Sequence, residues 1–168
     1  MRRLAIVVPI VLLLIFVLLV SALGSFRSAT LIMVNLPFAV IGGVAAMYFF
    51  EIHLSVAATI GFIAVLGVAV EDALVLVSFC DQLRKKGLKT LDAVYKACFL
   101  RVRPLVMTTM TTLLGLLPML YATGAGSEIQ RPLVVVIFGG MISSLILELI
   151  VLPVLYVLVN PDKTSDRP

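Results

Sequence analysis

The chain has 168 residues, of which 62% are hydrophobic and only 13% are charged, and its net charge is +4. A soluble domain is roughly half apolar and about a quarter charged, so this composition excludes a water-soluble enzyme or binding domain and indicates an integral membrane protein. The small basic excess has no soluble scaffold on which a nucleic-acid groove could form. We therefore expect one membrane domain over residues 1–160 and no nucleic-acid partner.

The first apolar segment, Leu4–Leu23, carries no charge. At about 1.5 Å per helical residue it matches a hydrocarbon core of about 30 Å. Its basic start and the small residues near its end also resemble a signal peptide, which is the alternative interpretation. The second predicted span, residues 29–50, contains Asn35, Pro37 and the pair Gly42-Gly43. Small residues of this kind allow close contact between membrane helices.

The third predicted span covers residues 54–80 and follows a loop with the single histidine, His53. A lone loop histidine is more often solvated than a metal ligand. Cys80 and Cys98 lack the spacing of a metal site, and we interpret them as reduced thiols in buried or interfacial positions.

Residues 81–104 form the one long polar stretch and carry seven basic residues. Apolar residues recur in it at steps of three and four, which predicts an amphipathic cytoplasmic helix on the membrane surface; a solvated basic loop would give the same topology. Pro104 is expected to open the fourth span, residues 105–121. Met107 and Met110 in this span are weak candidates for handling a soft metal cation, although scattered methionines are more often packing residues.

The last predicted span covers residues 133–159, and a polar tail follows over residues 161–168. Ser127 and Gln130 have the spacing of a capping box, which predicts a helix start at this membrane face. The expected fold is thus an all-α bundle of five transmembrane helices with one cytoplasmic amphipathic helix.

The basic residues predict the orientation of the chain. With the N-terminus outside, five spans place ten of the 13 lysines and arginines on the inside, as the positive-inside rule favours. The basic start Met1-Arg2-Arg3 opposes this orientation. We therefore expect that an upstream part of a larger protein places this end outside.

Two adjacent carboxylates, Glu71 and Asp72, lie inside the third apolar segment, and Glu148 lies inside the last. An ionised side chain at the centre of a membrane helix costs roughly 2.5–3.5 kcal/mol, so these residues predict a function. Because a buried carboxyl group favours its neutral form, such groups can hold and release protons. The three are candidates for a proton relay, with Asn35 and Ser78 as polar support; the alternative is that they stay protonated and join helices by hydrogen bonds.

Glu71 shares its helical face with small residues, whereas Asp72 shares a bulkier face. We therefore expect Glu71 to face the interior of the bundle. No nucleophile with a base and no phosphate-binding loop occurs, so the sequence does not indicate an enzyme, and it indicates no cofactor.

Several short motifs in a fixed order resemble the C-terminal transmembrane half of the resistance-nodulation-division (RND) transporters, in particular the heavy-metal efflux branch. The motifs are Gly24-Ser25-Phe26-Arg27, Val34-Asn35-Leu36-Pro37, Gly61-Phe62-Ile63-Ala64, Arg101-Val102-Arg103-Pro104, Gly115-Leu116-Leu117-Pro118, Glu128-Ile129-Gln130-Arg131-Pro132 and Leu152-Pro153-Val154. The resemblance implies that the five spans correspond to the eighth to twelfth helices of a twelve-helix protomer.

The same resemblance implies a multi-pass protein of the inner membrane, with a periplasmic N-terminus and a cytoplasmic C-terminus. It implies a homotrimer that works with an N-terminal half, porter domains, a periplasmic adaptor and an outer-membrane channel. It further implies that proton influx drives export of a divalent or monovalent metal cation, and that Glu71 and Asp72 lie at the tenth-helix proton site. The expected function is part of such a pump, not active alone; the alternative is a non-transporting assembly subunit or an inactive remnant.

Overall fold

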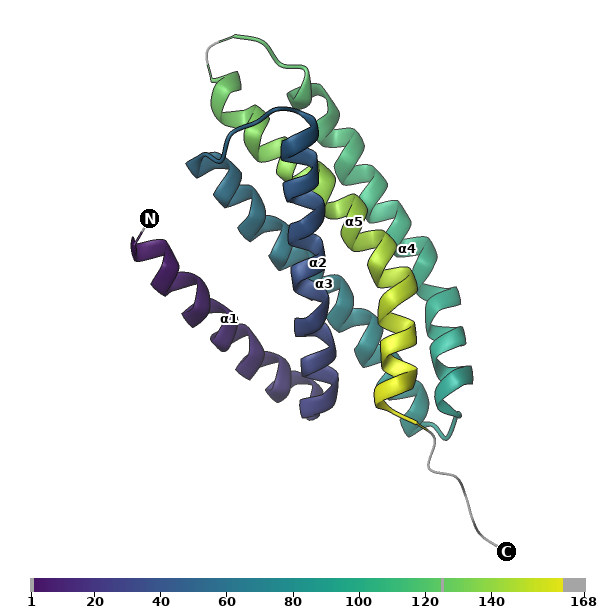
Figure 1. Ribbon diagram of the computed structural model, residues 1–168. Coiled ribbons are helices and arrows are strands. Elements are labelled where there is room, and N and C mark those ends of the chain that lie inside the picture. The colour runs from purple at the N-terminus through teal and green to yellow at the C-terminus, as the bar shows by residue number, and fades with distance from the viewer. Residues whose placement is uncertain (1, 125, 162–168) are drawn as a thin grey trace, which may run out of the picture.

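The computed structural model describes residues 2–124 and 126–161. Within these residues the chain forms five α-helices and no β-strand (Figure 1). The helices are α1 (Arg2–Leu23), α2 (Phe26–Phe49), α3 (Val56–Lys85), α4 (Thr90–Leu120) and α5 (Ser127–Val159). The predicted all-helical class is therefore confirmed. The polar tail predicted for residues 161–168 lies, apart from Pro161, outside the described residues.

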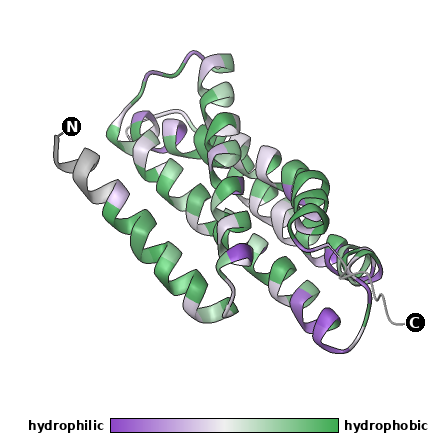
Figure 2. Cartoon of the chain, turned by 60° about the horizontal axis from the view of Figure 1, so that its bottom comes forward, coloured by the Kyte–Doolittle hydropathy of each residue, from purple (hydrophilic) through white to green (hydrophobic). Residues whose placement is uncertain are grey.

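Four of these helices, α2 to α5, have the length and apolar composition needed to cross a membrane. The apolar part of α1 that can be judged, Pro9–Leu23, is shorter, so a fifth span stays a prediction. Apolar residues cover the shafts of the helices, and hydrophilic residues gather at their ends and in the loops (Figure 2). Large apolar side chains also face outward, among them Leu13, Phe49 and Leu158. An apolar outer surface of this kind fits a lipid environment.

Helix α5 is the centre of the bundle, because it packs against α2, α3 and α4. Helix α1 has its main contact with α2 and diverges from the other helices toward its N-terminus (Figure 1). Helices α2 and α5 run antiparallel, whereas α3 and α5 run parallel (Figure 1). This arrangement decides which polar residues meet inside the bundle.

Glycines allow α5 to approach α2 and α3 closely. A Cβ atom added to Gly42 would lie 2.7 Å from the carbonyl oxygen of Gly139, and one added to Gly139 would lie 2.6 Å from that of Gly42. At Gly61 the added atom would lie 2.9 Å from the carbonyl oxygen of Leu133. These approaches are too short for any larger residue. The predicted close contact through the small residues of the second span is therefore confirmed.

The region 81–104 differs from its prediction. No separate surface helix is present there, because α4 runs without interruption from Thr90 to Leu120 with Pro104 inside it. A proline removes only its own backbone donor, which leaves one carbonyl oxygen four residues earlier without its helical partner, and membrane helices tolerate such a loss. In the same turn of α4, the Thr108 hydroxyl donates to the carbonyl oxygens of Pro104 and Leu105, at 3.0 Å each.

In the first part of α4, the apolar residues that recur at steps of three and four, among them Leu91, Tyr95 and Val102, lie on the outer side of the helix. Ala93, Val94 and Ala97 are buried, whereas Leu91 and Tyr95 are 65% and 74% exposed. Small residues, not large ones, thus form the packed face here.

The predicted capping box at Ser127 and Gln130 is wrong. Helix α5 begins at Ser127 after Gly126, which has a positive φ of 96°, and no side chain caps the helix. The Ser127 hydroxyl instead donates to the carbonyl oxygen of Gly124 at 2.8 Å. Serine caps occur at two other helix starts, where Ser25 accepts from the backbone of Ser28 and Ser55 from that of Ala58.

Candidate functional site

Glu71 and Asp72 lie in the middle of α3 and point in different directions. The side chain of Glu71 is exposed, as are its neighbours along the same face, Ala64 and Gly67. The expectation that Glu71 faces the interior of this bundle is therefore wrong. Residue size did not distinguish the two faces of α3, because the packed face also contains small residues, Gly61, Ala69 and Ala73, beside larger ones such as Val65.

Asp72 is half-buried, and Glu148 of α5 is 1% exposed. Asp72 lines a small cavity together with Ser144, which lies one helical turn before Glu148 on the same face of α5. Two contacts between the parallel helices explain this. A Cβ on Gly140 would touch Val65, and the Tyr156 hydroxyl donates to Asp81 Oδ1. Both pairs have the same offset of 75 residues along the chain, and that offset places Asp72 level with Leu147, one residue before Glu148.

Asn35 of α2 lies at about the same level of the bundle. The Ser143 hydroxyl of α5 donates to the carbonyl oxygen of Phe38 at 3.4 Å, which sets the register of the antiparallel pair α2 and α5. In that register Asn35 is within about one helical turn of Glu148. Asn35 is 1% exposed, and among the described residues neither of its amide atoms has a hydrogen-bond partner.

Helix α4 contributes Thr109 to the same level of the bundle, and this side chain is 3% exposed. Asp72, Thr109 and Ser144 line a small cavity of about 10 Å³, together with apolar side chains. This volume is at the lower limit of what one water molecule needs, about 10–15 Å³. The cavity thus has room for a water or a proton-transferring group and none for a hydrated metal ion.

We call Asn35, Asp72, Thr109, Ser144 and Glu148 the buried polar layer. Among the described residues, the Ser144 hydroxyl and Glu148 Oε1 are buried without a hydrogen-bond partner, as is the Asn35 amide. Each unsatisfied buried group costs about 1–3 kcal/mol. Polar groups inside a membrane bundle cost free energy, and their presence therefore indicates a function.

The other predicted residues lie outside this layer. The Ser78 hydroxyl donates to the carbonyl oxygen of Val75 at 3.0 Å and to no carboxylate. Met107 and Met110 are 61% and 48% exposed on the outer face of α4. Within the described residues, no three histidine, cysteine, aspartate or glutamate side chains are grouped so that they could hold a metal ion.

A second polar cluster, which the sequence did not reveal, joins three helices at one end of the bundle. Asp81 of α3 accepts hydrogen bonds from the Ser28 hydroxyl of α2, at 3.1 Å, and from the Tyr156 hydroxyl of α5. Tyr156 is 1% exposed. The pairing was not predictable, because Asp81 directly precedes a run of basic residues and read as part of a solvated loop.

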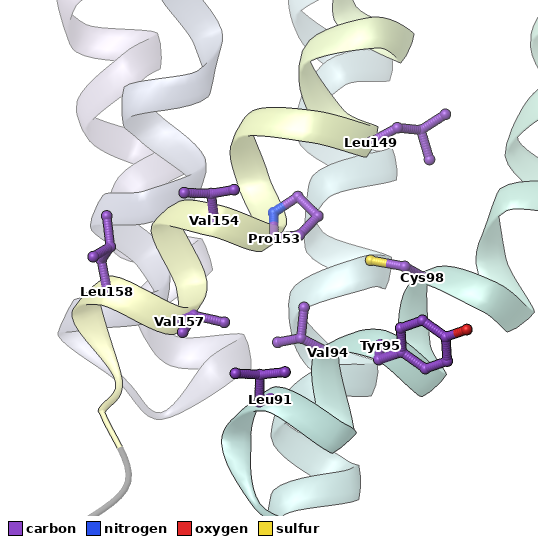
Figure 3. Close-up of a pocket in the computed structure, with 9 residues that line it drawn as sticks. All are labelled: Leu91, Val94, Tyr95, Cys98, Leu149, Pro153, Val154, Val157 and Leu158. Atoms are coloured by element: carbon purple, nitrogen blue, oxygen red, sulfur yellow. The ribbon is translucent and has the colours of Figure 1, made fainter.

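An apolar groove of about 390 Å³ lies between α4 and α5 (Figure 3). Val94, Cys98, Pro153 and Val157 line it from the two helices, and Tyr95 lies beside it (Figure 3). No carboxyl group lines this groove. The buried polar layer, and not this groove, therefore has the side chains needed for acid–base chemistry inside this multi-pass helical membrane protein.

Residues 1–160 match the AcrB/AcrD/AcrF family. The chain is 46% identical over 154 residues to the cobalt-zinc-cadmium resistance protein CzcA of Cupriavidus metallidurans, covering 92% of this chain and 14% of that protein. It is 49% identical over 156 residues to the protein HelA of Legionella pneumophila, covering 92% of this chain and 15% of that protein.

Among solved structures, the crystal structure of a heavy metal efflux pump superposes with a TM-score of 0.86 at 39% identity. That match covers 94% of this chain and 16% of the other. The chain belongs to the AcrB/AcrD/AcrF family of RND transporters, in the heavy-metal efflux branch. It spans about one seventh of the length of the relatives that it matches.

Proposed function

We propose that this chain is the C-terminal transmembrane part of a proton-driven heavy-metal cation efflux pump, and that Asp72 and Glu148 carry protons within it. The observation that carries the proposal is that Asp72 lines a small cavity with Ser144, one helical turn before the buried Glu148. Because no lysine or arginine lines the adjoining cavity, the two carboxyl groups have no counter-charge there. Two such groups are best accommodated when at least one holds a proton.

Glu71 has a separate place in this proposal. It lies on an outward stripe of α3 with Ala64 and Gly67, and a Cβ added to Gly67 would meet nothing within 4 Å. In the longer relatives, more than four fifths of the protein lies beyond the matched segment. We propose that a helix of that remaining part packs on this stripe and brings its own polar groups to Glu71. The proton path then continues from Glu71 into the missing half.

The topology and the partners follow from the same proposal. The five helices are the eighth to twelfth of a twelve-helix protomer in the inner membrane, with the N-terminus periplasmic and the C-terminus cytoplasmic. The protomer forms a homotrimer, and its partners are the N-terminal half with its porter domains, a periplasmic adaptor and an outer-membrane channel. The cargo is a metal cation, as the names of the relatives indicate for those proteins.

The test uses a chimera in which this chain replaces the matching segment of CzcA. In cells that lack their own pumps, the chimera is assayed for zinc resistance, and inverted vesicles are assayed for zinc-coupled proton movement. Asp72→Asn and Glu148→Gln are each expected to reduce both signals to the level of cells without the pump. Glu128→Gln changes an exposed carboxylate at the start of α5 and is the matched control.

Unchanged resistance and unchanged proton movement in both Asp72→Asn and Glu148→Gln would overturn the proton role. That result would favour the alternative function, a membrane subunit that uses these helices only for assembly. A chimera that is inactive before any substitution, although it is inserted and trimeric, would favour an inactive remnant.

A further inference from the structure

The end of the bundle that holds Asp81 contains a polar cavity of about 490 Å³ that the proton site does not use. It lies where α2 begins and where α3 and α5 end, beside the loop between α3 and α4. Hydrophilic residues gather at this end of α3 (Figure 2). The polar residues that line the cavity are Ser25, Ser28, Asp81, Arg84, Lys85 and Asn160.

The charges of the described residues around this cavity favour an anion. Arg84 and Lys85 both line it, and the one carboxylate among the described lining residues, Asp81, already accepts hydrogen bonds from Ser28 and Tyr156 with its two oxygens. The two positive charges thus outnumber the one negative charge.

One residue that lines the same cavity carries an unsatisfied donor. The amide nitrogen of Asn160 is buried, and within the described residues it has no hydrogen-bond partner. A phosphate oxygen would satisfy this donor and the two cationic side chains together, because phosphate accepts several charge-assisted hydrogen bonds.

A second cavity at the same end indicates where such a phosphate comes from. An apolar groove of about 320 Å³ runs along α2 and α5, lined by Leu31, Val34, Leu155 and Val159, with Arg27 at its start. Consecutive residues belong to the two cavities, since Val159 lines the groove and Asn160 the polar cavity. A free phosphate would use only the polar cavity, whereas a phospholipid would use both.

We propose that this end of the bundle binds an anionic phospholipid, with its phosphate between Arg84, Lys85 and Asn160 and an acyl chain in the groove between α2 and α5. Basic residues at membrane helix ends attract anionic headgroups, and pockets between helices with such residues bind lipid head groups. The lipid would link the ends of α2, α3 and α5 at the membrane surface.

The test measures lipid binding to the purified full chain in detergent by native mass spectrometry. The probes are dioctanoyl phosphatidylglycerol, dioctanoyl phosphatidylcholine and inorganic phosphate. The double variant Arg84→Gln/Lys85→Gln should bind phosphatidylglycerol about 25-fold more weakly, because each basic residue near an anionic surface contributes about fivefold. The double variant Lys86→Gln/Lys89→Gln removes the same charge from the adjoining loop, at residues that do not line the cavity, and it should bind almost as wild type.

The groove is tested separately. Val34→Trp should fill it and weaken phosphatidylglycerol binding, whereas Ile41→Trp, at another exposed apolar position of α2, should leave binding unchanged. Thermal unfolding checks that each variant is folded, and Asn160→Leu offers a second way to remove the phosphate contact if Arg84→Gln/Lys85→Gln does not fold. Equal losses in the two lysine-containing double variants would overturn the site, because diffuse surface charge would then explain binding. Displacement of the lipid by millimolar inorganic phosphate would overturn the lipid as occupant.

Discussion

Adjacent serines on α5 show how differently two buried hydroxyl groups act. The Ser143 hydroxyl donates to the carbonyl oxygens of Gly140 and Phe38, at 3.1 Å and 3.4 Å. The Ser144 hydroxyl is buried without a partner among the described residues and belongs to the buried polar layer. The Ser143 hydroxyl therefore joins two helices. The unpaired Ser144 hydroxyl lowers the free energy of unfolding, so a contribution to stability does not explain its presence.

The pair predicts opposite effects on stability. Ser143→Ala should lower the free energy of unfolding by about 0.5–1.5 kcal/mol, because it removes a hydrogen bond, whereas Ser144→Ala should raise it by about 1 kcal/mol. The measurement is thermal unfolding of the purified chain in detergent, followed by circular dichroism. A Ser144→Ala variant as destabilised as Ser143→Ala would show that a bound group pairs with the Ser144 hydroxyl.

Tyr156 gives a second prediction at this scale. Its hydroxyl is buried and donates to Asp81, so Tyr156→Phe should destabilise the chain by about 1–3 kcal/mol. Tyr95→Phe removes a hydroxyl from a side chain that is 74% exposed and should leave unfolding unchanged. Equal unfolding temperatures for both variants and the wild type would contradict a stabilising role for the cluster of Ser28, Asp81 and Tyr156.

At the scale of helices, the glycine contacts between α2 and α5 decide the shape of the bundle. Gly139→Val should destabilise the chain by about 1–3 kcal/mol or more, because the new side chain would overlap the backbone of Gly42. Gly67→Val is the control, since it enters open space on α3. Both are measured by thermal unfolding, and a loss of similar size at Gly67 would contradict the packing described.

Much of the helical arrangement was predictable from the sequence, because long apolar segments separated by glycine and serine mark helices reliably. The errors arose where rules for soluble helices do not hold in a membrane bundle, or where helix packing decides the outcome. Pro104 read as a helix boundary, yet α4 continues through it. Glu71 and Asp72 were identified as unusual, but the face of α3 that packs inward depends on the register with α5, which no local pattern contains. The sequence identified Glu148 only as an acid inside an apolar segment. Its position near Asp72 could be recognised only once the packing of α3 against α5 was known.

At the scale of the whole molecule, the outward stripe of α3 is the feature that connects this chain to its longer relatives. Ala64, Gly67 and Glu71 form a face of small residues around one carboxylate. Small residues allow membrane helices to pack closely, whereas a surface that faces lipid does not require small residues. A stripe of this kind without a partner in the described chain is therefore consistent with a neighbouring helix in the complete pump.

Gly67→Val should have different effects in the chain alone and in the complete pump. In the chain alone the substitution should leave thermal unfolding unchanged, because a Cβ at this position meets nothing within 4 Å. In the CzcA chimera it should reduce zinc resistance and proton movement several-fold, because a helix packed on the stripe would be displaced from Glu71. Leu114→Val, at an exposed position of α4, is the control and should leave thermal unfolding of the chain and activity of the chimera unchanged. A chimera with Gly67→Val that retains full activity would show that no helix packs closely on this face and that Glu71 acts, if at all, toward lipid or water.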